Sequence, residues 1–306
     1  MFQGTMTAIV TPFRDGKVDE SALVALVEAQ IAGGIDALVP CGTTGEATTM
    51  TDEEQRQVIT ITVNTAKKRV PVIAGAGSNS TARAIAASRM AREAGVDGLL
   101  HVTPYYNRPS QEGCFRHFEA IAKATPLPIV LYNVPGRTNV DLGVDTLVRL
   151  AEFSNIVAVK EATGSVARTL AILHKLGDRY AILCGDDAVN YPMYCVGAKG
   201  CISVLGNVAP TLLSECWDAH VAGDAKKARE AHERSLALID ALFLDTNPIC
   251  VKAALAIMGR MAPDIRLPLY PLEGPTLERV RSALVQAGLA LLPPEGQGRA
   301  SGRGLA

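Results

Sequence analysis

Short apolar runs recur along the chain, and a stretch with helical character follows each of them. Near-continuous apolarity over three to five residues indicates strands that are covered on both faces, as in a parallel sheet. The predicted strands are Thr7–Val10, Ala37–Val39, Val70–Ala74, Gly98–Val102, Pro128–Tyr132, Ile156–Lys160, Tyr180–Leu183 and Cys201–Val204.

Helix signals lie between these runs and dominate after residue 208. Thr51 to Glu54 has the form of a capping box, in which the threonine accepts from a free backbone N–H and the glutamate reaches back to the cap. The stretch from Ser80 to Glu93 stops before Gly95, a natural helix end. Only helices are expected near the C-terminus, over Pro210–Val221, Asp224–Phe243, Pro248–Met258 and Pro275–Ala287.

Eight strands that alternate with helices fit either a closed barrel or an open doubly wound sheet. Polar, glycine-rich segments follow several strands, as at 42–46, 133–137 and 185–187, and in a barrel these segments meet at one mouth. An open sheet would carry a GxGxxG-type loop after its first strand, which is absent at 10–13. We therefore predict an α/β fold: a (β/α)₈ TIM barrel over residues 1–225, a C-terminal helical domain over 226–292 and a disordered tail over 293–306.

Composition narrows the classes of partner. The chain has 30 basic and 31 acidic residues without a block of like charge, which argues against a nucleic-acid or membrane-surface partner. No run approaches the roughly 18 apolar residues of a membrane span, and no signal peptide is recognisable. The seven scattered cysteines form no CxxC pair, which is typical of reduced thiols. We expect a cytoplasmic protein.

Lys160 is the most informative position, because it is the only lysine inside any predicted strand. The period of two along a strand puts Ile156, Ala158 and Lys160 on one face, so at a barrel mouth this amine points inward. An arbitrary lysine at a strand end more often extends to solvent. Here the residues that precede Lys160 in its strand are apolar, and polar segments follow the other strands. Both features favour a nucleophile that forms a Schiff base with a carbonyl substrate.

Three further segments carry candidate chemistry. Tyr132 ends the strand before that of Lys160 and could shuttle protons, although alone it would be an ordinary strand aromatic. Residues 42–46, Gly-Thr-Thr-Gly-Glu, could bind an anion through backbone N–H groups and hydroxyls, or form a plain turn. Arg137 follows a Pro-Gly turn and suits a carboxylate, but a surface arginine is equally compatible. Asp186 and Asp187 lack a third metal ligand with fitting spacing, so we interpret them as a helix cap and structural hydrogen-bonding groups.

Together these motifs resemble the pyruvate-dependent class I aldolase superfamily, and most closely its dihydrodipicolinate synthase family. The resemblance runs from Phe2 to about Leu289. It is carried by 8–12 (Ala-Ile-Val-Thr-Pro), 42–46, 103–109 (Thr-Pro-Tyr-Tyr-Asn-Arg-Pro), 132–138 (Tyr-Asn-Val-Pro-Gly-Arg-Thr), 160–164 (Lys-Glu-Ala-Thr-Gly) and 185–187 (Gly-Asp-Asp).

The resemblance implies a role for each residue. Lys160 would form the Schiff base with pyruvate, and Tyr132 would donate and accept protons. Thr43 and Tyr106 would complete a hydroxyl relay, with Tyr106 supplied by a neighbouring subunit. The remaining implied contacts are to substrate carboxylates: Thr44 and the backbone at Ile202 for pyruvate, and Arg137 for L-aspartate 4-semialdehyde.

The resemblance also implies a homotetramer, built as a dimer of dimers, that needs no organic cofactor and no catalytic metal. One departure concerns regulation. Relatives inhibited by lysine hold it with a glutamate and histidines at the dimer interface, where this chain has Arg83, Asp52 and Gln55. An arginine would repel the ammonium group of lysine, so we predict weak or absent feedback inhibition.

Other functions share part of this pattern. N-acetylneuraminate lyases and 2-keto-3-deoxy sugar-acid aldolases would also have Lys160, Tyr132 and the 42–46 motif, but Arg137 and Tyr106 argue against them. A phosphate-binding barrel would need glycine-rich anion loops after strands seven and eight, where Asp186 and Asp187 lie instead. A non-catalytic barrel that senses a 2-oxo acid is a third alternative.

Overall fold

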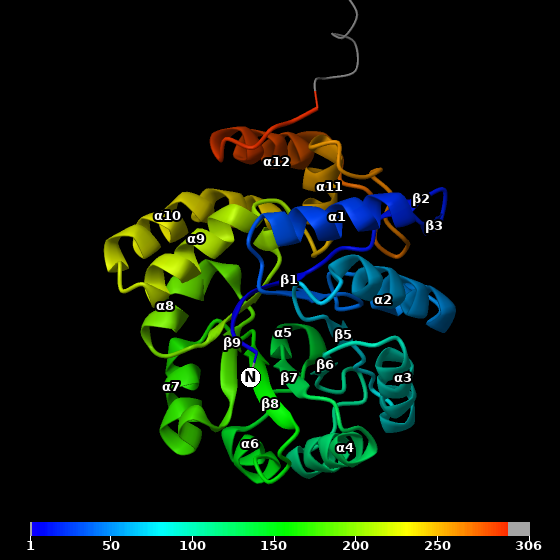
Figure 1. Cartoon of the computed structure of the whole chain (residues 1–306), viewed down its shortest axis with the longest axis vertical. Helices are drawn as coiled ribbons and strands as arrows, with labels where there is room; N and C mark the ends of the chain where they lie inside the picture. Colours follow the sequence, from blue (N-terminus) through cyan, green and yellow to red (C-terminus); the bar gives the residue numbers. More distant parts are fainter. Residues whose placement is uncertain (1, 293–306) are drawn as a thin grey trace, which may run out of the picture.

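The computed structural model describes residues 2–292. Eight parallel strands form one sheet in the order β4-β1-β10-β9-β8-β7-β6-β5, and a bridge between Leu38 and Val72 joins its two ends. The (β/α)₈ barrel prediction is confirmed (Figure 1). Its strands are β1 (Gly4–Ala8), β4 (Ala37–Val39), β5 (Ile73–Gly75), β6 (Gly98–Val102), β7 (Ile129–Asn133), β8 (Ile156–Glu161), β9 (Ala181–Cys184) and β10 (Gly200–Ser203).

Helices cover the outside of the barrel and continue beyond it. The predicted starts are confirmed: Thr51 forms a complete capping box with Glu54, and Ser80 caps the helix that follows it. The helices are α1 (Glu20–Ala32), α2 (Asp52–Ala66), α3 (Thr81–Glu93), α4 (Gln111–Ala124), α5 (Pro135–Thr138), α6 (Val144–Leu150), α7 (Val166–Leu176), α8 (Asn190–Cys195), α9 (Pro210–Val221), α10 (Ala225–Leu242), α11 (Ile249–Ile257) and α12 (Gly274–Gln286), with 3₁₀ turns η1 (Ala47–Thr49), η2 (Gly177–Arg179), η3 (Asp187–Val189) and η4 (Leu205–Asn207).

The first strand lies earlier in the chain than its apolar run predicts. Strand β1 ends at Ala8, whereas the prediction placed it at 7–10. In β1 the apolar side chains alternate with threonines. Met6 and Ala8 pack inside the barrel with side chains of other strands, among them Ile73 and Val130. Strand pairing sets the bounds of β1, because β10 and β4 pair with the chain between Gly4 and Ala8. A short antiparallel hairpin, β2 (Phe13–Arg14) with β3 (Lys17–Val18), follows and was not predicted.

A β-bulge changes the inner face of β8. Ile156 pairs with Ile129, but the next residue of β7 pairs with Ala158, so Val157 is the extra residue. Such an insertion shifts the alternation of side chains. Ile156 therefore packs outside the barrel with Ile129, and the prediction that it shares the inner face with Lys160 is wrong. Ala158 does lie on the inner face.

The C-terminal helices gather at one end of the molecule, in yellow to red in Figure 1. They lie beside the hairpin β2–β3, since the Asp15 N–H donates to Asp264 at 2.9 Å. The domain division at residue 225 stays a prediction, and the predicted tail at 293–306 lies outside the described residues. Among residues 2–292, no helix has the length and apolarity to cross a membrane.

Candidate active site

The lysine predicted as nucleophile and the predicted proton shuttle face each other on adjacent strands. Lys160 in β8 is directly paired with Tyr132 in β7, and its Nζ lies 4.3 Å from the centroid of the tyrosine ring. Only 6% of Lys160 is exposed. Its side chain lines a cavity of about 370 Å³ at the barrel mouth.

This inner cavity brings together most of the predicted site residues. Five of them line it: Thr43, Thr44, Tyr132, Arg137 and Lys160. The cavity therefore joins the carboxyl ends of β4, β7 and β8, where the site of an α/β barrel is expected.

The other two predicted residues lie elsewhere in the single chain. Ile202 is buried in β10 among the inner barrel side chains, and nearby Val204 lines the cavity. Tyr106 does not line the cavity; it is 89% exposed, with a left-handed backbone (φ 70°). Of the side chains predicted to form the site, only that of Tyr106 is missing from the cavity of the single chain.

The segment 42–46, here called the threonine loop, is held in a compact turn. The N–H of Gly45 donates to the carbonyl of Gly42, and that of Glu46 donates to the carbonyl of Thr43, both at 3.1 Å. Thr11 Oγ1 donates to the carbonyl of Gly45 at 2.7 Å. These bonds leave the side chain of Thr43 exposed towards the cavity.

Asn247 ties the loop to the far end of the sequence. Its Nδ2 donates to Thr44 Oγ1 at 2.9 Å, and its carbonyl accepts from Arg137 Nη2 at 3.3 Å. Sequence reasoning missed Asn247. The only signal was a polar pair, Thr246 and Asn247, before a predicted helix, and nothing in that pair indicates which barrel loop it meets.

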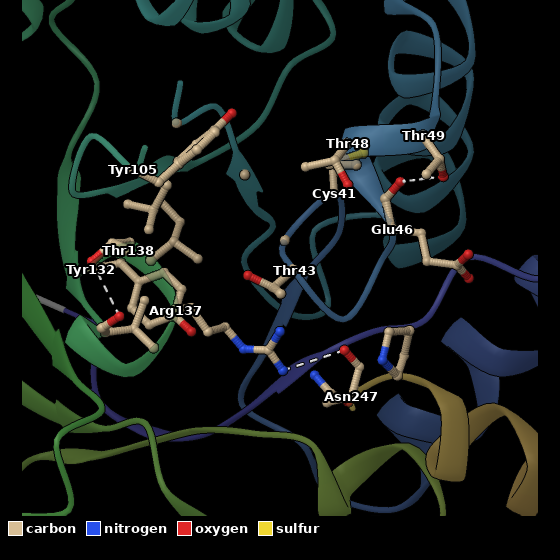
Figure 2. Close-up of a pocket in the computed structure, with 18 of the residues that line it drawn as sticks. Cys41, Thr43, Glu46, Thr48, Thr49, Tyr105, Tyr132, Arg137, Thr138 and Asn247 are labelled. Carbon is tan, nitrogen blue, oxygen red and sulfur yellow. Dashed lines mark hydrogen bonds between the residues drawn. The ribbon is translucent and has the colours of Figure 1, made fainter. Parts of the chain in front are cut away.

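A second cavity of about 340 Å³, here called the outer cavity, adjoins the first and shares part of its lining. Tyr132, Thr43, Arg137 and Asn247 line both cavities, and Figure 2 shows the first three converging at its centre. The outer cavity adds Thr138 and apolar groups from the segment before α12. The site is thus a two-part cleft, with the amine of Lys160 in the inner cavity and the guanidinium of Arg137 lining both parts. A guanidinium suits a carboxylate ligand.

The acidic residues after β9 have the structural roles that the sequence indicated. Asp186 caps η3 through the N–H of Ala188. Asp187 accepts from the N–H groups of Val204 and Leu205 at 2.8 and 2.9 Å. Asp186 also lines the inner cavity, and burial raises the pKa of its carboxyl. No group of three or more His, Cys, Asp or Glu side chains in residues 2–292 is arranged to hold a metal ion.

Glu161 fixes the end of the lysine strand from the opposite face. It is fully buried, pairs with Arg168 at 2.7 Å and accepts from Asn133 at 3.2 Å. Because neighbouring residues of a strand point in opposite directions, this network anchors β8 without occupying the cavity.

A third cavity of about 630 Å³ lies between α2 and α3. It is lined by Asp52, Gln55 and Arg83, the three residues singled out for lysine regulation. Cys41, just before the threonine loop, lines this cavity and the outer cavity of the cleft.

Known proteins match this chain over nearly its whole length. The family model described as the dihydrodipicolinate synthetase family matches residues 1–287. A 4-hydroxy-tetrahydrodipicolinate synthase from Syntrophus aciditrophicus is 49% identical, over 94% of this chain and 99% of that protein.

Solved structures of the same family also match this chain. The 4-hydroxy-tetrahydrodipicolinate synthase from Methylacidiphilum fumariolicum SolV is 46% identical with a TM-score of 0.93, over 94% of this chain and 96% of that one. The chloride-inhibited dihydrodipicolinate synthase from Acinetobacter baumannii, solved with pyruvate, is 47% identical with a TM-score of 0.93, over 94% and 100% of the two chains.

Proposed function

Because the chain belongs to the dihydrodipicolinate synthetase family, we propose that it is a lyase that condenses pyruvate with L-aspartate 4-semialdehyde. This is the reaction of 4-hydroxy-tetrahydrodipicolinate synthase in lysine and diaminopimelate biosynthesis. The observation that carries the proposal is the buried Lys160 paired with Tyr132 at the inner end of a two-part cleft. The pyruvate complex of the A. baumannii relative supports the choice of first substrate.

The first half of the reaction prepares a carbon nucleophile. The neutral amine of Lys160 attacks C2 of pyruvate, and the carbinolamine loses water to form an imine. Tyr132 supplies the proton for the leaving water, with Thr43 and Tyr106 relaying it. Tyr132, now a phenolate, accepts a proton from C3, which gives the enamine and restores the phenol. The imine nitrogen serves as the electron sink, so the proposal includes neither an organic cofactor nor a catalytic metal.

The second half makes the carbon–carbon bond and releases the lysine. The enamine carbon attacks the aldehyde of the semialdehyde, and Tyr132 protonates the new alkoxide. The amino group of this substrate then attacks C2 and displaces Lys160, which closes the ring and regenerates the free amine. Each step is a proton transfer, an addition or an elimination, so no external oxidant or reductant is required.

Hydrogen-bonding groups place the two substrates along the cleft. The hydroxyl of Thr44 and the backbone at Ile202 hold the pyruvate carboxylate near Lys160. Arg137 lines the outer cavity as well, and its guanidinium receives the carboxylate of the semialdehyde.

Tyr106 is proposed to act in the site of a neighbouring subunit. Its side chain is 89% exposed and lines neither part of its own chain's cleft, which suits a residue that crosses an interface. The active form would then be a homotetramer, a dimer of dimers in which each subunit completes its partner's relay.

The reaction is tested by trapping the imine. Incubation with pyruvate and borohydride should add the mass of the reduced adduct to the peptide that contains Lys160. A Lys160→Ala variant should remain unmodified. Condensation with aspartate semialdehyde should then exceed turnover with N-acetylmannosamine or glyceraldehyde. Absence of an adduct on Lys160 would refute the mechanism, and preference for a sugar would assign the chain to another aldolase type.

We also propose that lysine inhibits this enzyme weakly or not at all. The cation of Arg83 shares the 630 Å³ cavity with Asp52 and Gln55, and it would repel the ammonium group of bound lysine. Assays over a range of lysine concentrations should show little inhibition, and Arg83→Glu should increase the sensitivity. A sub-millimolar inhibition constant for the wild type would contradict this proposal.

A further inference from the structure

Glu46, the last residue of the threonine loop, belongs to a buried ion pair. Lys252 in α11 contacts the carboxylate of Glu46, and each side chain is only 2% exposed. The second carboxylate oxygen accepts from the backbone N–H of Arg266 at 3.1 Å, and the amine of Lys252 lies 4.4 Å from the centroid of the Phe13 ring. Both charges are withdrawn from water, so each depends on the other for compensation.

Glu46 closes the loop in a backbone conformation that glutamate rarely adopts. Its φ is 55°, and Cys41 just before the loop has φ 56°. Non-glycine residues in this left-handed region are held there by their surroundings and concentrate at functional sites. The backbone of Glu46 bonds to Thr43 and Thr49 within its own segment, and its carboxylate adds contacts to Lys252 and Arg266 from the C-terminal region.

The C-terminal segment that contains Lys252 also contacts the threonine loop at a second residue, Thr44. Asn247 contacts Thr44, and Lys252 lies near the start of α11. The two contacts bridge 203 and 206 residues of sequence. Figure 2 shows that the side chain of Glu46 runs away from Thr43. Glu46 lines the outer cavity but not the inner one, where Lys160 lies. With respect to Lys160 it is therefore placed to act through the loop.

We propose that Glu46 and Lys252 are positioning residues: their buried pair holds the threonine loop so that Thr43 and Thr44 face Lys160. The inference rests on the proposed function, because it concerns the rate at which pyruvate forms its imine. The competing role is structural, in which the pair only stabilises the attachment of α11 to the barrel.

The test compares Glu46→Gln, Lys252→Met and the double variant. Each single change leaves one buried charge unpaired and should lower Tm, whereas the double variant removes both charges and should regain most of the lost Tm. For all three we expect kcat/KM for pyruvate, and the rate of borohydride trapping at low pyruvate, to fall by about tenfold or more, because the loop is no longer held. A double variant with restored Tm and wild-type kcat/KM would show a purely structural role and overturn the proposal.

Arg179→Met is the matched control for lost stability. Arg179 donates to the carbonyls of Ala151, Phe153 and Ile156 at 2.7–3.0 Å, at the opposite end of β8 from Lys160. This variant should lower Tm while kcat/KM for pyruvate stays within about twofold of wild type. An equal fall in kcat/KM would attribute the loop variants' defect to instability and overturn the inference.

The wild type separates this inference from the proposed function. If the wild type forms no adduct, the proposed function fails and the inference fails with it. If the wild type reacts and the loop variants react equally fast, only the positioning role fails.

Discussion

At the scale of single residues, the space around Lys160 is as important as its chemistry. A Cβ at Gly185 would lie 2.7 Å from Cβ of Ala162 and 3.0 Å from Cε of Lys160. The first distance is shorter than carbon atoms tolerate, so a side chain at 185 must displace one of these neighbours. Gly185 therefore keeps the lysine free to point into the cleft.

Gly185→Ala should consequently reduce kcat/KM for pyruvate by about tenfold or more, since displacing a reacting group by about 1 Å can cost up to a hundredfold. Steady-state kinetics and borohydride trapping measure the effect. Gly136→Ala is the control, because a Cβ there meets nothing within 4 Å. Equal activity of the two variants would show that Lys160 tolerates the added methyl group.

At the scale of elements, strand β6 packs against α3 and α4 through two buried histidines. His101 in β6 contacts Ser88 at 3.2 Å, and His117 in α4 contacts Thr81 at 2.9 Å. Burial lowers the pKa of His101 to about 3, with a smaller effect of the positive charge on His117. Burial alone lowers the pKa of His117 to about 4.

The packing of these elements should therefore weaken in acid. Because both folded pKa values lie below the unfolded value of about 6.5, the unfolded chain binds protons first as the pH falls. The stability is fully present above pH ~6.5 and is lost towards pH 4 and below, by about 1.4 kcal/mol per pH unit for the fully buried His101. We expect Tm to fall less between pH 7 and pH 5 in His101→Gln than in the wild type.

His174→Gln, at an exposed position in α7, is the control for this experiment and should keep the wild-type pH dependence of Tm. If His101→Gln retains the full loss between pH 7 and pH 5, the buried histidine is not its source.

At the scale of the whole molecule, the cleft of a single chain lacks the hydroxyl of Tyr106. If a neighbouring subunit supplies it, Tyr106→Phe and Lys160→Ala subunits should complement each other in mixed oligomers. Random pairing makes half of the dimers mixed, and each mixed dimer has one intact site, so refolded mixtures should recover about a quarter of wild-type activity. Mixtures no more active than the sum of the separate variants would place Tyr106 outside the partner's site.

Several features of fold and site could be predicted because their signals are local. The strand runs, the capping box at Thr51 and the place of Lys160 in its strand depend on periodicity and on neighbouring residues. The alternation of strands with helices also brings the strand ends, and thus Thr43 and Arg137, to one mouth. These conclusions need no knowledge of long-range contacts.

The sequence by itself therefore determined the barrel and the residue types at its mouth. Only the tertiary structure revealed the bulge at Val157, the hydrogen bond from Asn247 to Thr44 and the buried ion pair of Glu46 with Lys252. The physical reason is separation along the chain: the contacts to Thr44 and Glu46 join residues more than 200 positions apart. No local pattern specifies which partner a buried carboxylate or amide will meet when the C-terminal helices pack onto the barrel.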